Sequence, residues 1–281
     1  MKSPLLKNGF LDAYLNISQP FVMNTPDSEI KRWGIVVIQS IPKNERQTGT
    51  QLYEDLLRYK PIMDGSIFCE LIDVYDKNDF ESAFSKILSK LEEGDILTIH
   101  VEAHGSDDGI ALSSNEIVEW KEFYDLIRPI NIALGHLLLI VMAMCKSIAM
   151  ISNISIEQRA PYRAFICTTR EMYPDELYEG FLSFYEKFCN LLDVFGAMTA
   201  LQKEILYENG RSPFQLLTAE AVFEETLSST RNIDDLSVNQ LNRMVQPITQ
   251  ENLERMRGQI RELLVELQSK YSDYYNFRDL Y

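Results

Sequence analysis

The sequence predicts an α/β protein in which a mostly parallel β-sheet is covered by helices on both faces. Five short apolar, β-rich runs start near residues 35, 67, 96, 137 and 162, a spacing of 25 to 41 residues. Most of the segments between them carry apolar residues at helical intervals. Strands and helices that alternate in this way are typical of βαβ units, in which a helix joins two parallel strands.

Each strand of the first half is a β-rich run, and each helix has apolar residues at intervals of three and four. A proline at position 42 follows the first strand. An asparagine at position 78 is a suitable N-cap for the second helix. In order, the expected elements are a strand at 34–39, a helix at 50–60, a strand at 67–75, a helix at 78–93 and a strand at 96–103.

The second half of the alternating region starts with turn residues after Gly105, which indicate a short hairpin. The run from Leu137 to Met144 is entirely apolar, as expected of a central strand that is buried on both faces. An aromatic-rich helix closes the region. The expected elements after the hairpin are a helix at 119–134, a strand at 137–144, a strand at 162–168 and a helix at 175–192.

Residues 193–281 show no convincing strand. Apolar stripes indicate helices at 238–245 and 251–271, with Thr249 as a cap for the second. We therefore divide the chain into an N-terminal extension (1–33), an α/β core (34–192) and a helical C-terminal region (193–281). The C-terminal helices either pack on the core as a layer or dock a regulatory protein partner, and the sequence leaves both alternatives open.

The composition excludes a disordered chain, a collagen-like chain and a small disulfide-rich scaffold. The chain has 281 residues, of which 46% are hydrophobic and 25% charged, as in ordinary globular proteins. There are 42 Asp and Glu against 27 Lys and Arg, which gives a formal net charge of -15. Nucleic acids and anionic membranes bind basic surfaces, so we expect neither as the main partner.

The cysteines and the apolar runs indicate a cytoplasmic protein. The four cysteines are widely spaced, with no CxxC, which favours a reducing compartment. No secretory signal is evident at the start of the sequence. The longest apolar run, Leu137 to Met144, is far shorter than the roughly 20 residues that span a bilayer.

Two reactive residues follow neighbouring strands. Ligands of open α/β sheets bind at the carboxyl ends of the strands, where this chain has His104 and Cys145. A thiol and an imidazole placed together can act as nucleophile and base. A helix expected to start near Ser147 would stabilise the thiolate. The backbone amides of Gly105 and Cys145 could donate to an oxyanion.

The remaining cysteines and one histidine have positions that favour structural roles. Cys69 and Cys167 lie inside apolar strands, and Cys189 lies on the apolar face of a helix, so we expect all three to be small core side chains. His136 precedes a strand at its amino end, the wrong end of the sheet for catalysis.

Two polar residues inside the third strand allow two interpretations. His100 and Glu102 share a face with His104 if the strand is regular to its end. Glu102 either pairs with His100 as a buried couple or orients the imidazole of His104. Asp107 and Asp108 are expected in a solvated turn.

The two strand ends resemble those of the caspase-like cysteine peptidases, which include caspases, metacaspases, separases, gingipains and bacterial CHAT-type domains. The segments are ILTIHVEAHG, ending in His-Gly, and LLLIVMAMC, ending in Ala-x-Cys. His104 and Cys145 are 41 positions apart, close to the caspase interval of about 50. The resemblance covers roughly residues 34–192 and is closest to the bacterial members. It implies a cysteine endopeptidase with a His104–Cys145 dyad, a protein substrate, and no metal or organic cofactor.

The departures from the family bear on specificity. The caspase signature Q-A-C-x-G is absent, because Ala143 replaces its glutamine. The Asp that arginine-specific relatives carry at the same place is also missing, so neither an acidic nor a basic P1 preference is inherited. Arginines in comparable caspase loops bind substrate, which implies this role for Arg46 and Arg170. The alternative is that both are surface arginines paired with acids such as Glu45 and Glu171.

Three functions remain open from the sequence. The first is a cysteine endopeptidase, which in some bacterial relatives serves a defence system and cleaves a partner such as a gasdermin. The second is a non-catalytic interaction or regulatory protein with a caspase-like fold, against which the retention of both His104 and Cys145 argues. The third is an unrelated α/β hydrolase or nucleotide-binding domain, for which the GxGxxG, GxxxxGK[ST] and GxSxG fingerprints are absent.

Overall fold

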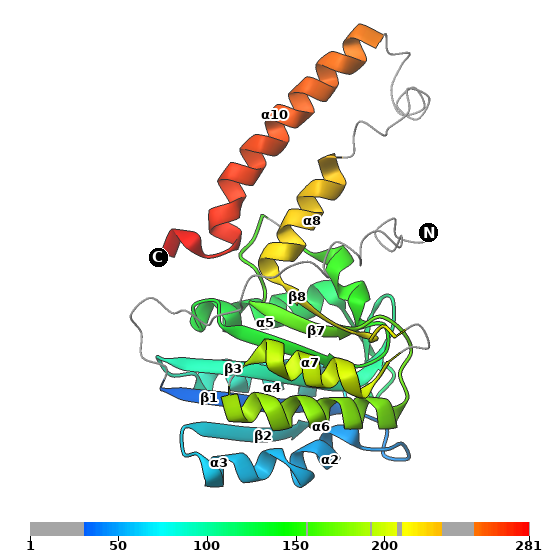
Figure 1. Cartoon of the computed structure of the whole chain (residues 1–281). Coiled ribbons are helices and arrows are strands. Elements are labelled where there is room, and N and C mark those ends of the chain that lie inside the picture. Colours follow the sequence, from blue (N-terminus) through cyan, green and yellow to red (C-terminus); the bar gives the residue numbers. More distant parts are fainter. Residues whose placement is uncertain (1–30, 156, 192, 207–209, 232–249, 281) are drawn as a thin grey trace.

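The protein folds around one twisted, mostly parallel β-sheet, seen in a computed structural model that describes residues 31–155, 157–191, 193–206, 210–231 and 250–280 (Figure 1). The strand order is β2-β1-β3-β6-β7-β8, and only β8 runs antiparallel to its neighbour. The strands are β1 (Arg32–Ser40), β2 (Ile67–Asp73), β3 (Asp95–Gly105), β6 (Leu138–Ala143), β7 (Ala164–Thr168) and β8 (Phe214–Thr218). The predicted α/β class with a mostly parallel sheet is confirmed.

Helices cover both faces of the sheet (Figure 1). One face carries α2 (Thr48–Asp55), α6 (Pro174–Leu191) and α7 (Val194–Glu204). The other carries α4 (Lys77–Lys90) and α5 (Trp120–Ala133). Short helical turns connect them, namely η2 (Leu57–Tyr59), α3 (Lys60–Met63) and η3 (Ser147–Asn153). The all-apolar β6 is buried at every position, as predicted for a central strand.

Alternation along β3 divides its side chains between two cores. Ile99 and Val101 pack with the aromatic side chains of α4 and α5 in one core. His100 and Glu102 point to the opposite face, where His100 contacts Phe181 and Tyr185 of α6. Paired residues of neighbouring parallel strands point to the same face of the sheet. The alternation along β3 therefore also predicts the face on which His104 and Cys145, at the strand ends, lie.

A short hairpin follows β3, as the turn residues predict. It consists of β4 (Gly109–Ala111) and β5 (Ile117–Glu119), which pair antiparallel. Asp107 and Asp108 lie exposed in the preceding turn, and Trp120 Nε1 donates to the Asp107 carbonyl at 3.1 Å. The prediction of a solvated turn is confirmed.

Two local predictions were wrong. The region after residue 192 was expected to lack strands, yet β8 pairs with β7 and extends the core sheet, with α7 packed on α6. The sequence FQLLT is only five residues long and does not alternate apolar and polar side chains regularly, so the local signal for a strand is weak and its conformation depends on this non-local pairing. The N-cap of α4 is Asp76, whose side chain accepts from the Asp79 amide at 2.9 Å, rather than Asn78.

The C-terminal region packs on the core at one end. In Figure 1, α8 (Ala219–Arg231) and α10 (Gln250–Tyr275) project side by side away from the sheet, followed by η5 (Arg278–Leu280). The end of α10 is anchored where the ring of Tyr275 packs against the ring of Phe223 of α8, with centroids 5.1 Å apart and planes tilted by 32°. The expected helix at 251–271 is confirmed, whereas 238–245 and Thr249 lie outside the described residues. No helix of the described ranges is long and apolar enough to span a membrane.

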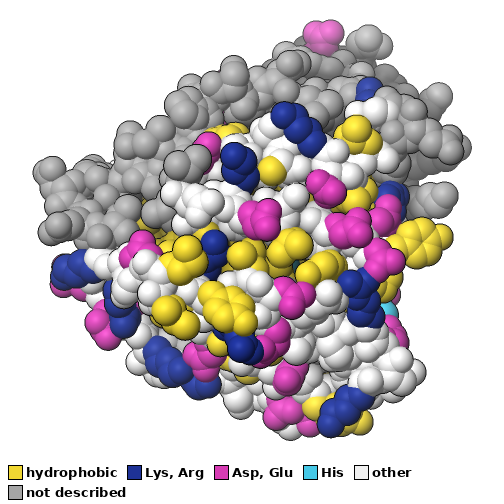
Figure 2. Space-filling view, turned by 60° about the horizontal axis from the view of Figure 1, so that its bottom comes forward, with side chains coloured by type: hydrophobic (Ala, Val, Ile, Leu, Met, Phe, Trp, Pro, Cys, Tyr) yellow, Lys and Arg dark blue, Asp and Glu magenta, His cyan; other side chains and the backbone are white. Residues whose placement is uncertain are grey.

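The edge strand β2 leaves apolar side chains near the surface. Figure 2, which brings the bottom of Figure 1 forward, shows hydrophobic side chains gathered in the middle of this face with charged ones around them. Phe68 and Ile72 of β2 are half-buried, and Ile62 and Met63 of α3 are exposed. Glu70, in the centre of β2, forms ion pairs with two lysines of α4, and a charge on an edge strand discourages pairing with another chain.

Candidate active site

The carboxyl ends of β3 and β6 lie directly against each other. The parallel register pairs Glu102 with Ala143, and two positions further along each chain come His104 and Cys145. A Cβ added at Gly105 would lie 2.1 Å from the carbonyl oxygen of Cys145, so the two backbones approach as closely as only a glycine permits. The structure therefore places the two predicted catalytic residues on adjacent strand ends.

Both residues lie on the face covered by α2 and α6. Ala143 belongs to the core on this face, and Glu102 points into it. The imidazole of His104 meets Glu45, from the loop that leads into α2. The thiol of Cys145 meets Met172, which packs in the same core. Each side chain thus contacts a loop on the same side of the sheet.

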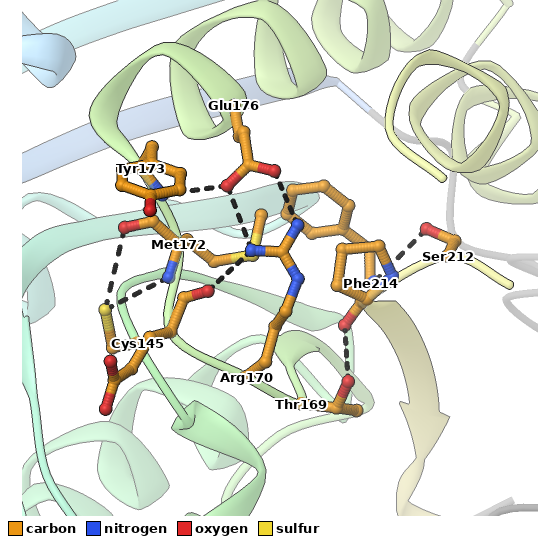
Figure 3. A network of polar contacts seen from close by, with 10 residues as sticks. Cys145, Thr169, Arg170, Met172, Tyr173, Glu176, Ser212 and Phe214 are labelled. Carbon is orange, nitrogen blue, oxygen red and sulfur yellow. Dashed lines mark hydrogen bonds and ion pairs between the residues drawn. The ribbon is translucent and has the colours of Figure 1, made fainter. Parts of the chain in front are cut away.

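The thiol of Cys145 lies against the main chain of Met172 (Figure 3). The Met172 amide donates to Sγ at 3.4 Å, and Sγ donates to the Met172 carbonyl at 3.8 Å. An amide that donates to sulfur stabilises a thiolate, whereas the carbonyl accepts from the protonated thiol. The half-buried thiol therefore has a partner for either protonation state.

The loop of residues 169–173, here called the β7–α6 loop, is held in place by charged contacts (Figure 3). Arg170 Nη1 donates to Glu176 of α6 at 2.9 Å. Lys146 donates its backbone amide to the Arg170 carbonyl at 3.0 Å, and its ammonium pairs with Glu171 at 2.9 Å. These contacts fix Met172 over the thiol.

A strained turn follows the nucleophile candidate. Lys146 adopts a left-handed backbone with φ 52° and ψ 26°. Such a conformation is uncommon for a residue other than glycine and is found preferentially at functional sites. The helix expected after Ser147 is present, but it is the short 3₁₀ helix η3, so the Met172 amide is the donor that the structure places on the sulfur.

The other cysteines and His136 have structural positions, as predicted. Burial raises the pKa of Cys69 to about 12 and of Cys189 to about 11, and it raises the pKa of Cys167 further. Burial also lowers the pKa of His136 to about 3, and its ring stacks on Phe277 at 4.5 Å. Cys145 is therefore the cysteine whose surroundings suit chemistry.

Of the two interpretations of Glu102, the structure shows the buried pair. Glu102 Oε1 lies 3.1 Å from His100 Nε2, and Oε2 accepts from the hydroxyl of Thr48. The second nitrogen of His100 lies 3.1 Å from the hydroxyl of Tyr185. Both carboxylate oxygens are thus occupied below the active-site edge, and neither is placed on His104.

The acid on His104 is Glu45, which the sequence reasoning missed. Glu45 Oε2 lies 2.9 Å from His104 Nε2, with the two side chains 43% and 53% exposed. Glu45 lies five residues after β1, in the loop that reaches the same edge of the sheet. The available signal was that Glu45 follows a strand next to the strand of His104. Proximity in sequence instead favoured a pair between Glu45 and its neighbour Arg46.

Arg46 and Arg170 reach the predicted edge of the sheet, and both are paired with acids. Arg46 forms an ion pair with Asp175 and lies over the ring of Tyr178, 5.1 Å from its centroid. Arg170 pairs with Glu176. The pairing with acids agrees with the surface alternative, but the acids differ from those expected, because Glu45 and Glu171 contact His104 and Lys146 instead.

Comparisons of the sequence add no family assignment. No protein-family model matches the chain, and no curated protein matches it either. Within the described residues, no three His, Cys, Asp or Glu side chains come together as a metal site.

Proposed function

We propose that the protein is a cysteine endopeptidase that uses Cys145 as nucleophile and His104 as base. The observation that carries this proposal is the contact of Gly105 with the Cys145 carbonyl, which brings an imidazole and a half-buried thiol to the same edge and face of the sheet. An imidazole beside a thiol is the usual means of making a sulfur nucleophile at neutral pH.

The reaction follows from these positions. His104 takes the thiol proton, and the sulfur attacks the carbonyl carbon of a peptide bond. The backbone amides of Gly105 and Cys145 donate to the oxyanion. The C–N bond then breaks as His104 protonates the leaving amine, and water hydrolyses the thioester to release the acid and restore the thiol. The sequence of steps uses no group beyond the chain, the substrate and water.

The substrate is proposed to be a protein, and we propose that neither Arg46 nor Arg170 selects its P1 residue. The charges of Arg46 and Arg170 are already matched by Asp175 and Glu176. A P1 carboxylate would have to compete with these pairs, and Ala143 supplies no polar contact of its own. This favours an uncharged P1 residue over an acidic one. A role in a bacterial defence system is what the family resemblance implies. The proposed cytoplasmic location rests on the spacing of the four cysteines, and a regulatory partner is one of the two alternatives for the C-terminal helices α8 and α10.

Covalent capture tests the function directly. The protein is incubated with peptidyl chloromethyl ketones that differ at P1, and the adduct is located by mass spectrometry. We expect one adduct, on Cys145, that is lost in Cys145→Ala and strongly reduced in His104→Asn. A wild-type chain that cleaves no protein and forms no adduct would contradict the peptidase and favour the non-catalytic interaction protein.

A further inference from the structure

The imidazole of His104 has an acidic partner, Glu45, which is not a member of the proposed dyad. Its Nε2 lies 2.9 Å from Oε2 of Glu45, in the loop between β1 and α2. We propose that Glu45 is a positioning residue, which orients the imidazole of His104 for the thiol of Cys145 and stabilises the imidazolium that forms. This inference rests on the proposed peptidase function and adds a third residue to its machinery.

The loop that carries Glu45 is built to hold its shape. The Glu45 amide donates to the Pro42 carbonyl at 2.9 Å. The side-chain amide of Gln47 donates to the carbonyls of Pro42 at 2.8 Å and Glu45 at 3.0 Å. Gln47 is held in turn by the buried Gln39 of β1, whose Nε2 donates to Gln47 Oε1 at 3.0 Å. The sheet thus fixes the backbone from which the carboxylate extends.

The next residue ties the same loop to the helix layer. Arg46 pairs with Asp175 of α6 and donates to Gln51 of α2 at 2.8 Å. Since Asp175 matches the charge of Arg46, the Glu45 carboxylate is directed to His104 rather than to its neighbour in sequence. The loop is therefore fixed to the sheet on one side of Glu45 and to the helices on the other, which keeps the Glu45 carboxylate beside the imidazole of His104.

The contact selects one protonation form of the ring. A carboxylate accepts from Nε2–H, which leaves Nδ1 as the nitrogen that takes the thiol proton. Once Nδ1 is protonated, the negative charge of Glu45 stabilises the imidazolium. Glu102 cannot do the same, because its oxygens are bound by His100 and Thr48.

Stability does not explain the pair. Both side chains are about half exposed, and ion pairs between exposed side chains contribute little to folding. Glu45→Gln should therefore leave the thermal midpoint unchanged. Glu92→Gln is the matched control, because Glu92 forms an exposed ion pair with Arg32 at 3.2 Å, at the amino ends of the strands.

The kinetic test separates turnover from binding. With a peptide substrate found by the capture experiment, we expect Glu45→Gln to lower kcat about 10- to 100-fold while KM changes less than about twofold. Glu45→Asp, whose shorter side chain keeps the charge, should recover part of the loss, and Glu92→Gln should match the wild type. A wild-type kcat in Glu45→Gln would overturn the inference.

A second readout does not depend on activity. Long-range proton–nitrogen NMR of the imidazoles, with His104 assigned by His104→Asn, reports which ring nitrogen carries the proton. We expect the proton on Nε2 in the wild type and a loss of this preference in Glu45→Gln, but not in Glu92→Gln. An unchanged tautomer in Glu45→Gln would overturn the positioning role, even if kcat falls. If the wild type is inactive and Cys145 forms no adduct, the peptidase proposal fails, while this measurement still decides whether Glu45 orients His104.

Discussion

At the scale of single residues, the groups around each sulfur separate Cys145 from the other three cysteines. Cys167 is buried in a core, Cys69 and Cys189 are half-buried against the other core, and desolvation raises the pKa of each. Cys145 is half-buried and receives a hydrogen bond from the Met172 amide. Since the thiolate is the nucleophile, the surroundings of each sulfur decide which cysteine reacts.

The first prediction concerns thiol reactivity. At pH 7.5, a limiting amount of iodoacetamide should modify Cys145 well before the other cysteines, because thiols whose pKa is about 11 or about 12 remain almost entirely protonated. Peptide mapping by mass spectrometry gives the order of reaction, and Cys145→Ala should remain unmodified over the same period. Modification of Cys69 or Cys189 first would contradict this picture of the four sulfurs.

A second prediction at this scale concerns the closest backbone contact in the site. Gly105→Ala places a methyl group 2.1 Å from the Cys145 carbonyl, so the ends of β3 and β6 must separate. We expect a loss of about 1–3 kcal/mol in the free energy of unfolding and a loss of peptidase activity. Gly65→Ala is the control, because no atom lies within 4 Å of its added Cβ. Equal urea midpoints for Gly105→Ala and Gly65→Ala would show that the backbones of Gly105 and Cys145 do not approach as closely as described.

At the scale of elements, two neighbouring strands carry His104 and Cys145 to the same edge of the sheet, and a separate loop contacts each side chain. The β7–α6 loop covers the thiol, and the loop before α2 holds the imidazole. Both loops are fastened to α6, one through Glu176 and the other through Asp175. The first turn of α6 therefore holds the loops on both sides of the proposed dyad.

The third prediction tests this fastening. Arg170 lowers the pKa of Glu176, so the carboxylate stays charged and the pair persists until the pH falls below the usual range of a glutamate. Glu176→Gln should loosen the β7–α6 loop and increase the rate at which iodoacetamide modifies Cys145. Glu179→Gln, an exposed position of the same helix, is the control and should react like the wild type. A slower or equal rate in Glu176→Gln would show that the loop does not restrict access to the thiol.

At the scale of the whole molecule, His136 joins the C-terminal segment to the α/β core. Its ring stacks on Phe277, and Asn131 of α5 lies 3.1 Å from its Nδ1. Arg159, nearby, forms an ion pair with Asp279 at 2.8 Å and lies over the ring of Phe277. Burial and the positive charges of Arg163 and Arg159 keep the imidazole neutral.

The fourth prediction follows from the titration of His136. The pKa is about 3 in the folded protein and 6.5 as the ordinary value, so between these pH values the unfolded chain binds a proton that the folded chain does not. Stability therefore falls as the pH drops from 6.5 toward 3, by up to about 1.4 kcal/mol per pH unit from this group. Thermal unfolding at several pH values should show a smaller acid loss in His136→Asn, since asparagine tolerates the positive φ of 68° at this position.

Two measurements show whether His136 causes this loss of stability at low pH. Since His136 faces Phe277, protonation should weaken the docking of the C-terminal segment before the sheet unfolds. Hydrogen exchange at pH 5 should then rise first in the end of α10, relative to β3 and β6. If His136→Asn loses stability with acid as steeply as the wild type, other groups control the response.

The sequence by itself determined the class of the fold and placed a histidine and a cysteine at the ends of two strands. Apolar runs at a regular spacing predicted the strands from β1 to β7, because hydrophobic periodicity and turn residues are local signals. His-Gly and Cys at the ends of two such strands predicted a shared edge, because parallel strands all end on the same side. The structural roles of Cys69, Cys167, Cys189 and His136 were predicted from their places in the expected strands and helices.

Only the tertiary structure decided which groups meet at that edge. The strand state of β8 depends on pairing with β7, and the assignment of Glu45 to His104 depends on how a loop crosses from β1 to α2. Arg46 and Arg170 pair with Asp175 and Glu176 of α6 instead of the acids beside them in sequence. The partners of these side chains are set by the backbone positions that folding provides, and a linear sequence does not encode those positions locally.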